Sequence, residues 1–356
     1  TSSTCQDCHA SNYTEVFNSG HPYKISQVVG GVSPTIPNSP GVPDPPVGFT
    51  WNDITYMIGG YGWKARFMDS EGYIITDGWN GVNAQYNLPR PDLGMGLPAA
   101  WTSYHATDPV RKPYTCGTCH TTGWLSFADN GGVNQDGLAG IHGTWEETGI
   151  TCEACHGPGV GHVVAQTAAA ITIDPTAELC GNCHFRDINH RIEASGGFIR
   201  HHEQFDELTN GGKDTFDCTT CHDPHILTRY GNADAGGILI SCDDAACHAT
   251  QAANNQHIVT VDCENCHMGR GSKSARSVHT FEGDIRTHIF TINTNPWPKD
   301  SMFFFDAVAG KTFAKNFVTL DVACYTCHTD PITLEGGGSS QQSLTDLSTR
   351  ATGIHN

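Results

Sequence analysis

The sequence predicts a mostly irregular fold of loops and short α-helices with one small β-hairpin element, whose interior is filled by bound groups. Three observations lead to this prediction. Only 38% of the 356 residues are hydrophobic, below the roughly 45–50% that is typical of a soluble domain. The chain contains 40 glycines and 18 prolines, which favour turns and loops. It also contains 16 cysteines, and their arrangement follows a strict pattern.

The cysteines form eight pairs, and a histidine directly follows the second cysteine of every pair. Seven pairs read C-x-x-C-H, whereas the eighth has four intervening residues. The seven regular motifs are Cys5/Cys8/His9, Cys116/Cys119/His120, Cys152/Cys155/His156, Cys180/Cys183/His184, Cys218/Cys221/His222, Cys263/Cys266/His267 and Cys324/Cys327/His328. The longer motif is Cys242/Cys247/His248. No cysteine lies outside the pattern.

This pattern is the attachment signature of c-type haem. Two thiols form thioethers with the vinyl groups of one porphyrin, and the adjacent histidine is held as the proximal iron ligand. A disulfide framework and zinc sites built from C-x-x-C pairs are the alternatives. Neither requires a histidine after every second cysteine, so we predict eight covalently attached haems c. The Cys242 motif departs from the commoner spacing.

Eight haems leave fewer than 45 residues of chain for each haem. We therefore expect a multihaem cytochrome c architecture in which the haems form the core and the polypeptide is a thin wrapper. Metal binding is coupled to folding in many small proteins, and by the same reasoning we expect the chain to be unfolded without haem.

Twelve histidines remain after the eight proximal ligands, enough to give every iron a second imidazole. Only five methionines are present, too few for general His/Met ligation. Bis-histidine ligation leaves no open position at the iron and gives lower potentials than ligation by methionine. The sequence therefore favours electron transfer over chemistry on small molecules.

The elements between the motifs follow from local composition. Residues 33–48 contain repeated prolines and predict an extended loop. Residues 54–58, 63–67 and 73–76 are β-prone runs separated by glycine-rich turns, which predict a small β-element over about 54–76. We expect one octahaem domain over residues 1–330. Residues 331–356 are expected to form a flexible linker and a short polar tail.

The formal net charge of −18 argues against a nucleic-acid partner, because a basic surface is the usual footprint of such binding. No run approaches the roughly 20 apolar residues of a membrane-spanning helix. Because the first motif begins at Cys5, we read the sequence as a mature chain from which a secretion signal has been removed. These features predict a secreted protein at the cell surface or outside the cell, with the periplasm as the alternative.

Beyond the cysteine motifs, the sequence resembles the secreted multihaem c-type cytochromes, including octahaem forms, of metal-reducing and related anaerobic prokaryotes. The likeness covers roughly residues 1–330. It rests on short matches at residues 21–24, 58–64, 116–124, 143–145, 152–162, 201–204, 218–225 and 283–288. The resemblance implies distal iron ligands at His21, His105, His162, His201, His202, His225, His257 and His288. His142, His190, His279 and His355 are held in reserve because the pattern does not require histidine there.

Some members of this group polymerise into extracellular filaments in which stacked haems form a wire. The resemblance therefore implies self-association of this chain, with other cytochromes and an extracellular or periplasmic acceptor as electron partners. We expect a protein that transfers electrons in anaerobic respiration and is not an enzyme. The alternatives are a periplasmic electron carrier and an octahaem reductase of nitrite, hydroxylamine or a sulfur oxyanion. The C-x-x-C-K motif of the best-known nitrite reductases does not occur.

Overall fold

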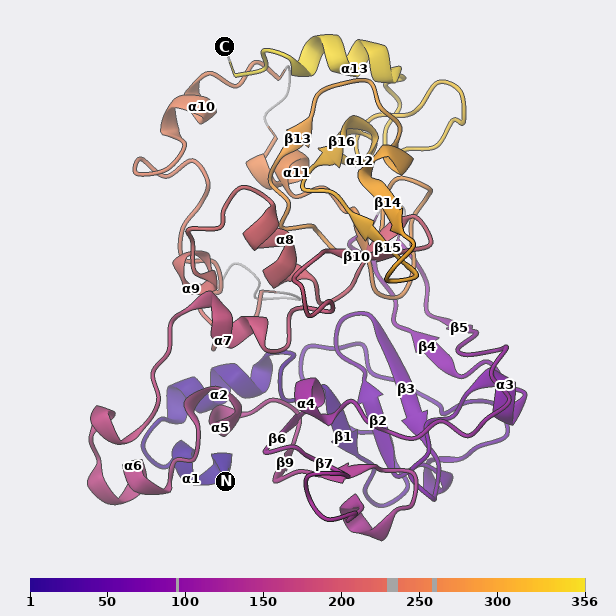
Figure 1. Ribbon diagram of the computed structural model, residues 1–356, viewed down its shortest axis with the longest axis vertical. Coiled ribbons are helices and arrows are strands. Elements are labelled where there is room, and N and C mark those ends of the chain that lie inside the picture. Colours follow the sequence, from indigo (N-terminus) through magenta and orange to yellow (C-terminus); the bar gives the residue numbers. More distant parts are fainter. Residues whose placement is uncertain (94–95, 229–235, 258–260, 356) are drawn as a thin grey trace. The chain divides into compact units, whose positions relative to one another are not determined.

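The computed structural model describes residues 1–93, 96–228, 236–257 and 261–355 (Figure 1). Its elements are short helices and short strands joined by long irregular segments, which confirms the predicted fold class. The chain divides into two compact units. Unit 1 comprises Thr1–Arg90, Pro98–Pro175 and His222–Leu239, and unit 2 comprises Pro91–Leu97, Thr176–Cys221 and Ile240–Asn356. None of the helices in the described ranges is long and apolar enough to cross a membrane.

Unit 1 contains a five-stranded antiparallel sheet in the order β1-β2-β3-β4-β5. The strands are β1 Ile25–Gln27, β2 Tyr56–Gly59, β3 Lys64–Met68, β4 Gln85–Asn87 and β5 Ala100–Thr102. The first two predicted runs correspond to β2 and β3, whereas the third contributes only isolated bridges through Ile74. The sheet is larger than predicted because β1, β4 and β5 span three residues each, too few to show an alternating pattern.

The β2–β3 hairpin depends on glycine at its turn. Gly59 has φ +80°, and a Cβ there would lie 2.6 Å from the Lys64 carbonyl oxygen. Glycine adopts such positive φ values without steric cost. The glycine-rich turn that the sequence predicted is therefore required by both the backbone conformation and the available space.

A protein-only hydrophobic core packs against this sheet. Phe67, Met57 and Leu88 are fully buried in one cluster. The proline-rich loop 33–48 forms no helix or strand, as predicted, yet it contributes buried Ile36 and Val42 to the same cluster. The loop is thus an integral part of the sheet's packing.

The rest of unit 1 is made of short pieces. Its helices and 3-10 turns are α1 Ser2–Gln6, α2 Ala10–Asn18, η1 Trp51–Asp53, α3 Asp77–Asn80, α4 Gly117–His120, η2 Gln135–Gly137, α5 Cys152–His156, α6 Val160–Ala165 and η3 Ala168–Ala170. Two two-stranded sheets pair β6 Thr121–Thr122 with β9 Glu147–Thr148 and β7 Leu125–Ser126 with β8 Gly143–Thr144.

Unit 2 contains a second five-stranded sheet that the sequence did not predict. Its order is β12 Ser272–Lys273, β11 Phe198–Arg200, β10 Glu193–Ser195, β15 Lys311–Ala314 and β14 Phe303–Asp306. β11 and β12 are parallel and the other neighbours are antiparallel. β13 Ile292–Asn293 pairs in parallel with β16 Val318–Thr319. The helices and 3-10 turn are α7 Ala177–Gly181, α8 Gln204–Asn210, α9 Cys218–Cys221, α10 Ala249–Ala253, α11 Cys263–His267, η4 Lys299–Met302, α12 Leu320–Cys324 and α13 Leu344–Ala351.

The segment after Pro331 packs against the rest of unit 2. The Gly337 N–H donates to the Tyr325 carbonyl at 2.8 Å. Helix α13 begins with a capping box between Ser343 and Asp346, which satisfies backbone donors at the helix start. Leu347 of α13 is buried in a cluster with Leu320 and Tyr325. The tail that the sequence presented as linker and polar segment is therefore anchored by a helix.

Candidate haem-attachment sites

Short helices position the cysteine motifs. All seven C-x-x-C-H motifs overlap a helix of unit 1 or unit 2. In the motif that begins in α7, the Cys180 carbonyl accepts from the Cys183 N–H at 3.1 Å and from the His184 N–H at 3.0 Å. Residues three and four positions apart lie on one face of a helix. The local fold thus presents two thiols and one imidazole on the same side, as thioether attachment of a porphyrin requires.

Four motifs extend beyond the helix in which they begin, because α1, α7, α9 and α12 end before the motif histidine. Helix α1 ends at Gln6, yet the Cys8 N–H donates to the Cys5 carbonyl at 3.2 Å. Helix α12 ends at Cys324, yet the Cys327 N–H donates to the Cys324 carbonyl at 3.0 Å. The turn that joins the two cysteines is therefore kept after the regular helix has ended.

Two motifs of unit 1 lie within or directly beside their helices. Cys119 belongs to α4, and its N–H donates to the carbonyl of Cys116, the residue before the helix, at 3.4 Å. Cys155 belongs to α5, which extends from Cys152 to His156. The Cys155 side chain is exposed and that of Cys119 is half-buried. Both thiols can therefore be reached from outside the chain.

The longer Cys242 motif has a different local structure. Its residues form turns, with the Cys247 N–H donating to the Asp244 carbonyl at 2.9 Å, and α10 begins immediately after His248. The two additional residues therefore replace a regular helical turn, although cysteine and histidine remain adjacent.

The cysteines are arranged to receive an attached group. The described residues include all sixteen cysteines; they form no disulfide, and each is partly or fully exposed, Cys8 and Cys327 among the fully exposed ones. Cysteines outside disulfides are normally among the most buried residues. Sixteen accessible thiols therefore fit covalent porphyrin attachment, which would cover them. The thioether bonds of Cys8, Cys119, Cys155, Cys327 and the other twelve cysteines stay a prediction.

Five of the eight motif histidines lie opposite a second histidine. The ring centroids are 6.0–6.2 Å apart in the pairs His9–His162, His156–His225, His184–His202, His257–His328 and His267–His355. Imidazole nitrogens bind transition metals at about 2.0–2.1 Å, as at zinc, so two imidazoles on opposite sides of one metal have ring centroids about 6 Å apart. The five separations match this geometry.

Hydrogen bonds orient many of these rings through Nδ1. The Nδ1 atom of His156 lies 2.8 Å from the Thr172 carbonyl oxygen, and that of His267 lies 2.8 Å from the Phe290 carbonyl oxygen. Further Nδ1 contacts to oxygen are His162 to Thr167, His184 to Gln204, His225 to Asp223, His355 to Gln251 and His120 to Lys24. A hydrogen bond at one ring nitrogen fixes the tautomer and leaves the other nitrogen for metal. These contacts leave Nε2 as the ligating atom.

Of the eight distal residues expected from the resemblance, the structure brings four beside motif histidines: His162, His202, His225 and His257. Of the consecutive pair, His202 has φ +73° and faces His184, whereas the His201 Nε2 lies 3.2 Å from Arg186 Nη2. A non-glycine residue at positive φ is uncommon. The two adjacent rings also pack on each other, with centroids 4.4 Å apart and 61° between their planes.

The other expected distal residues lie against different groups. The His105 ring packs on Tyr104 at 4.4 Å, and burial lowers the pKa of His105. The His288 Nδ1 lies 3.8 Å from Glu207 Oε2. The carbonyl oxygen of His21 accepts from the Ile150 N–H at 2.9 Å. Their role as iron ligands stays a prediction.

The three remaining motif histidines have distinct surroundings. Burial lowers the pKa of His120 to about 4, so its ring is neutral at pH 7, the form that binds metal. Lys213 Nζ donates to His248 Nε2 at 3.1 Å. His222 forms an isolated β-bridge with Ile238.

One reserve histidine was missed as a partner by the sequence reasoning. His355 lies 6.1 Å from His267. Among the other reserves, the His142 ring lies 5.3 Å from that of Phe127, His190 Nδ1 lies 3.0 Å from Asp206 Oδ1, and His279 Nε2 lies 3.4 Å from Glu282 Oε2. A serine followed three residues later by an aspartate, as at Ser343 and Asp346, is a signal that would have indicated a helix just before His355. No local pattern indicates which histidine His355 would reach.

The arrangement favours haem iron over a bare metal ion. Within the described part of the chain, no three His, Cys, Asp or Glu residues cluster as a metal site. A structural zinc site needs four protein ligands, whereas a porphyrin supplies four nitrogens and leaves two axial positions. Paired histidines are the ligand set that those positions require.

Several motifs within each unit lie close together. In unit 1, α1 contacts α5; in unit 2, α7 contacts α9 and α11 contacts α12. A hydrogen bond to Cys180, together with burial, raises the pKa of the Cys218 thiol. Burial and then Cys247 raise the pKa of Cys221, and burial and then Cys263 raise that of Cys242. Thiols of neighbouring motifs in unit 2 therefore adjoin one another along the unit.

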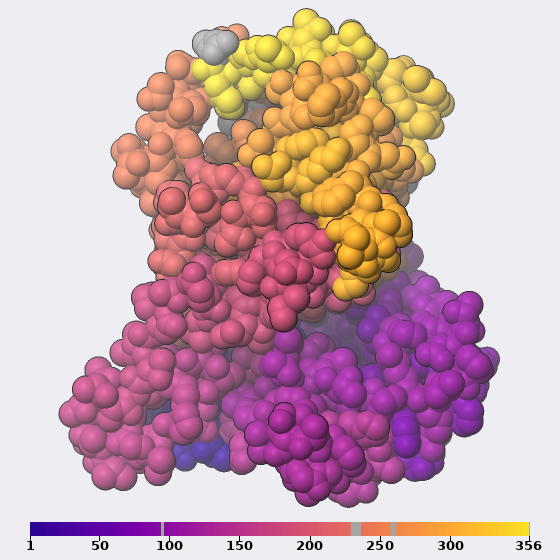
Figure 2. Space-filling model, in the orientation of Figure 1, coloured from indigo at the N-terminus to yellow at the C-terminus, as the bar shows by residue number. Residues whose placement is uncertain are grey.

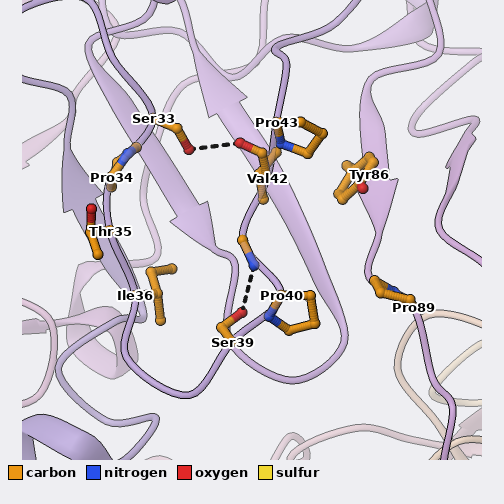
Figure 3. A pocket seen from close by; sticks show the side chains of 11 residues that line it. Ser33, Pro34, Thr35, Ile36, Ser39, Pro40, Val42, Pro43, Tyr86 and Pro89 are labelled. Carbon is orange, nitrogen blue, oxygen red and sulfur yellow. Dashed lines mark hydrogen bonds between the residues drawn. The ribbon is translucent and has the colours of Figure 1, made fainter.

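Two surface hollows of unit 1 differ in their relation to the motifs. One, of about 420 Å³, is lined by Thr118 from the Cys116 motif and by Glu153 and Ala154 from the Cys152 motif. The other, of about 450 Å³, lies between the proline-rich loop, Tyr86 and Pro89 (Figure 3). The second hollow is lined by no cysteine or histidine of the described residues and is not part of the attachment sites.

No protein-family model and no curated protein matches the chain. Solved structures do. The octaheme sulfite reductase MccA of Wolinella succinogenes, form II, gives a TM-score of 0.58 at 18% identity, covering 91% of this chain and 64% of its own. The chain thus spans less than two thirds of that protein. The outer cell wall cytochrome OcwA gives a TM-score of 0.52 at 14% identity, covering 98% of this chain and 85% of its own.

A third structure, the undecaheme cytochrome from the S-layer of Carboxydothermus ferrireducens, gives 0.44 at 15% identity, covering 83% of this chain and 52% of its own. This score does not establish a shared fold. The first two structures show that the chain has a fold found in multihaem cytochromes.

Proposed function

We propose that this chain transfers electrons through eight covalently attached c-type haems, most of them ligated by two histidines. The observation that carries the proposal is the set of five histidine pairs at 6.0–6.2 Å, each containing one motif histidine. Chance contacts between surface histidines would not select a C-x-x-C-H histidine in every pair.

The chain's own residues would attach the haems, orient the ligating imidazoles and fill the second ligand position at the iron. Each cysteine pair anchors one porphyrin edge, and Nδ1 contacts such as that of His156 to Thr172 hold the ring in position. The haem supplies one-electron redox chemistry. A second histidine beside each motif histidine would hold the haem iron as a further ligand, which would exclude substrate and favour a lower potential than methionine ligation. Both effects suit a carrier.

The contacts between motifs support an order for the electron path. In unit 2 the haems would follow the sequence of their motifs, from Cys180 to Cys218, Cys242, Cys263 and Cys324. In unit 1 the Cys5 and Cys152 motifs adjoin, and the Cys116 motif shares a hollow with the Cys152 motif. Adjacent attachment points would bring neighbouring porphyrins near one another.

The spin state of the iron tests the ligation. Electron paramagnetic resonance of the oxidised full chain should show low-spin signals for the haems of the five pairs. A predominantly high-spin spectrum from a fully loaded protein would contradict bis-histidine ligation. It would also remove the main support for a pure carrier.

We also infer that the protein works outside the cytoplasm, as a subunit of an extracellular cytochrome filament. The resemblance to filament-forming cytochromes and the likeness to an outer cell wall cytochrome support this location. Electron microscopy of natively purified protein tests it. Long filaments of uniform width are expected, whereas discrete particles would leave a periplasmic carrier or an enzyme.

A reductase is the second candidate function. The Cys242 motif supports it, because its spacing is unusual and its His248 Nε2 faces the Lys213 ammonium. The fold likeness to a sulfite reductase also supports it, although the chain spans 64% of that protein. An enzyme needs an open or labile iron position, so binding of carbon monoxide by the reduced wild-type protein would favour this function.

A further inference from the structure

The tail segment 344–355 ends beside an attachment site of the same unit. Its His355 ring lies 6.1 Å from that of His267, with 23° between the ring planes. His267 closes the Cys263/Cys266 motif on α11. The separation matches that of the four other histidine pairs, in which the partner comes from a loop or helix within the chain.

Both rings of this pair are held by backbone carbonyls. His267 Nδ1 lies 2.8 Å from the Phe290 oxygen, and His355 Nδ1 lies 3.1 Å from the Gln251 oxygen. Each contact leaves Nε2 for metal. Because Gln251 belongs to α10, the helix after the Cys242 motif, two neighbouring attachment segments and the tail meet at this site.

A few contacts hold the tail in place. The Gln256 N–H donates to the Ile354 carbonyl at 2.8 Å. Within α13, Leu347 is 5% exposed and packs on Leu320 and Tyr325. Figure 2 shows the C-terminal residues in yellow meeting the segment around residue 250 at the surface, above an opening in the face of this unit.

We propose that His355 is the second axial ligand of the haem at Cys263/Cys266, and that the tail is a latch which keeps this iron closed. The proposal rests on the proposed function, because it presumes haem at that motif. Release of the latch exposes one iron to small neutral ligands such as carbon monoxide or free imidazole. His355 is thereby committed to its own chain and is not the residue that joins neighbouring molecules.

The substitution His355→Ala in the full-length, haem-loaded chain tests the latch. Intact mass first establishes that wild type and variant carry the same eight haems. We expect the reduced variant to bind one more carbon monoxide per chain than wild type, and the oxidised variant to gain one high-spin signal. Free imidazole should abolish the high-spin signal by occupying the vacated position. His355→Met should keep the iron closed, because methionine is also an axial ligand.

Two further variants separate the latch from a general loss of structure. His142→Ala removes a histidine whose ring packs on Phe127, and it should leave carbon monoxide binding at the wild-type level. Leu347→Asp keeps His355 but removes the buried anchor of α13, and it should open the same single iron while making the chain at the exposed Arg350 easier for trypsin to cleave.

The proposal is overturned if His355→Ala carries eight haems yet binds carbon monoxide to the same extent as wild type. It is equally overturned if His142→Ala gives the same increase. A wild-type chain without haem at the Cys263 motif would instead contradict the proposed function. The mass measurement therefore distinguishes the two failures.

Discussion

Residues 10–115 and residues 152–267 differ in how much apolar surface their own side chains bury. The first contains no cysteine and forms the five-stranded sheet of unit 1. The second contains five haem motifs, and within its described residues no strand exceeds three residues. Among the described residues, seventeen hydrophobic side chains are buried in the first stretch and eight in the second.

This difference shows where side chains form a core, and it leads us to expect that the other stretch depends on haem. Burial of apolar surface is the main favourable term in folding. The sheet stretch obtains it from side chains such as Phe67 and Met57. The motif-rich stretch obtains little of it from side chains, so under the proposed function the porphyrins would supply the rest. We predicted that the whole chain is a thin wrapper around haem. The burial of side chains now limits this expectation to the motif-rich stretch.

The largest effect should follow from preventing haem attachment altogether. In a chain expressed without the attachment machinery, we expect β2 and β3 to keep slow amide exchange, because their core consists of side chains. Residues 152–267 should exchange at the rate of an unfolded chain, since their apolar filling is missing. Hydrogen exchange read by mass spectrometry, with the haem-loaded chain as control, measures both. Uniform amide exchange along the haem-free chain would contradict the claim that the two stretches differ in their dependence on haem.

A cavity in the sheet core should have the next largest effect. Phe67 is fully buried, and truncation of such a side chain costs about 3–5 kcal/mol. We expect Phe67→Ala to lower the unfolding free energy of unit 1 by this amount while the haem spectrum stays unchanged. Phe304→Ala, at a side chain that is 43% exposed, is the matched control. Loss of low-spin signals in Phe67→Ala would show that the two regions depend on one another.

The next effect concerns a buried lysine beside β11, and it is measured as the pH dependence of the unfolding free energy. Lys299 Nζ lies 3.5 Å from the centroid of the Phe198 ring, and burial lowers the pKa of Lys299 to about 8. The unfolded chain keeps the ordinary pKa near 10.5, so between these values it binds more protons than the native state. Stability should therefore rise as pH increases from about 8 to about 10.5.

The expected gain is of the order of 1–3 kcal/mol, since one pKa unit corresponds to about 1.4 kcal/mol. Lys299→Met should remove this part of the pH dependence, while the surface variant Lys315→Met should keep it. Thermal unfolding of the haem-loaded chain at both pH values provides the measurement. An unchanged slope in Lys299→Met would refute the assignment to this lysine.

The smallest effect on stability should come from one distal histidine in the motif-rich stretch. His225 lies 6.1 Å from His156, and its removal opens one iron without disturbing the cysteine attachment. We expect His225→Ala to bind one additional carbon monoxide per chain with little change in the unfolding midpoint. Asp223→Asn weakens the contacts of Asp223 Oδ1 to the His225 N–H and to His225 Nδ1, and it should shift the potential of that haem without opening it.

The sequence indicates the cysteine motifs as candidate attachment points because their signal is local. Cys180, Cys183 and His184 occupy nearby positions whose spacing is itself the geometry of one helical turn. The hairpin of β2 and β3 was also predictable, because Gly59 separates two β-prone runs. Signals of this kind are contained within a few residues.

Partners distant in sequence were not predictable in the same way. His355 meets His267 only because α13 docks through Leu347 onto α12. The second sheet escaped prediction since its strands span two to four residues, too short for a periodic signal. The features that the sequence did not predict, this histidine pair and the second sheet, thus depend on packing between residues far apart in the sequence.

The central claim is that eight motifs carry eight haems in a protein that transfers electrons. The most direct test is the intact mass of the natively purified chain, read together with carbon monoxide binding after reduction. The account predicts the polypeptide mass plus eight haems, with no more than a minor fraction of the haems binding carbon monoxide. A mass without attached haems, or one explained by disulfides or zinc, would contradict it.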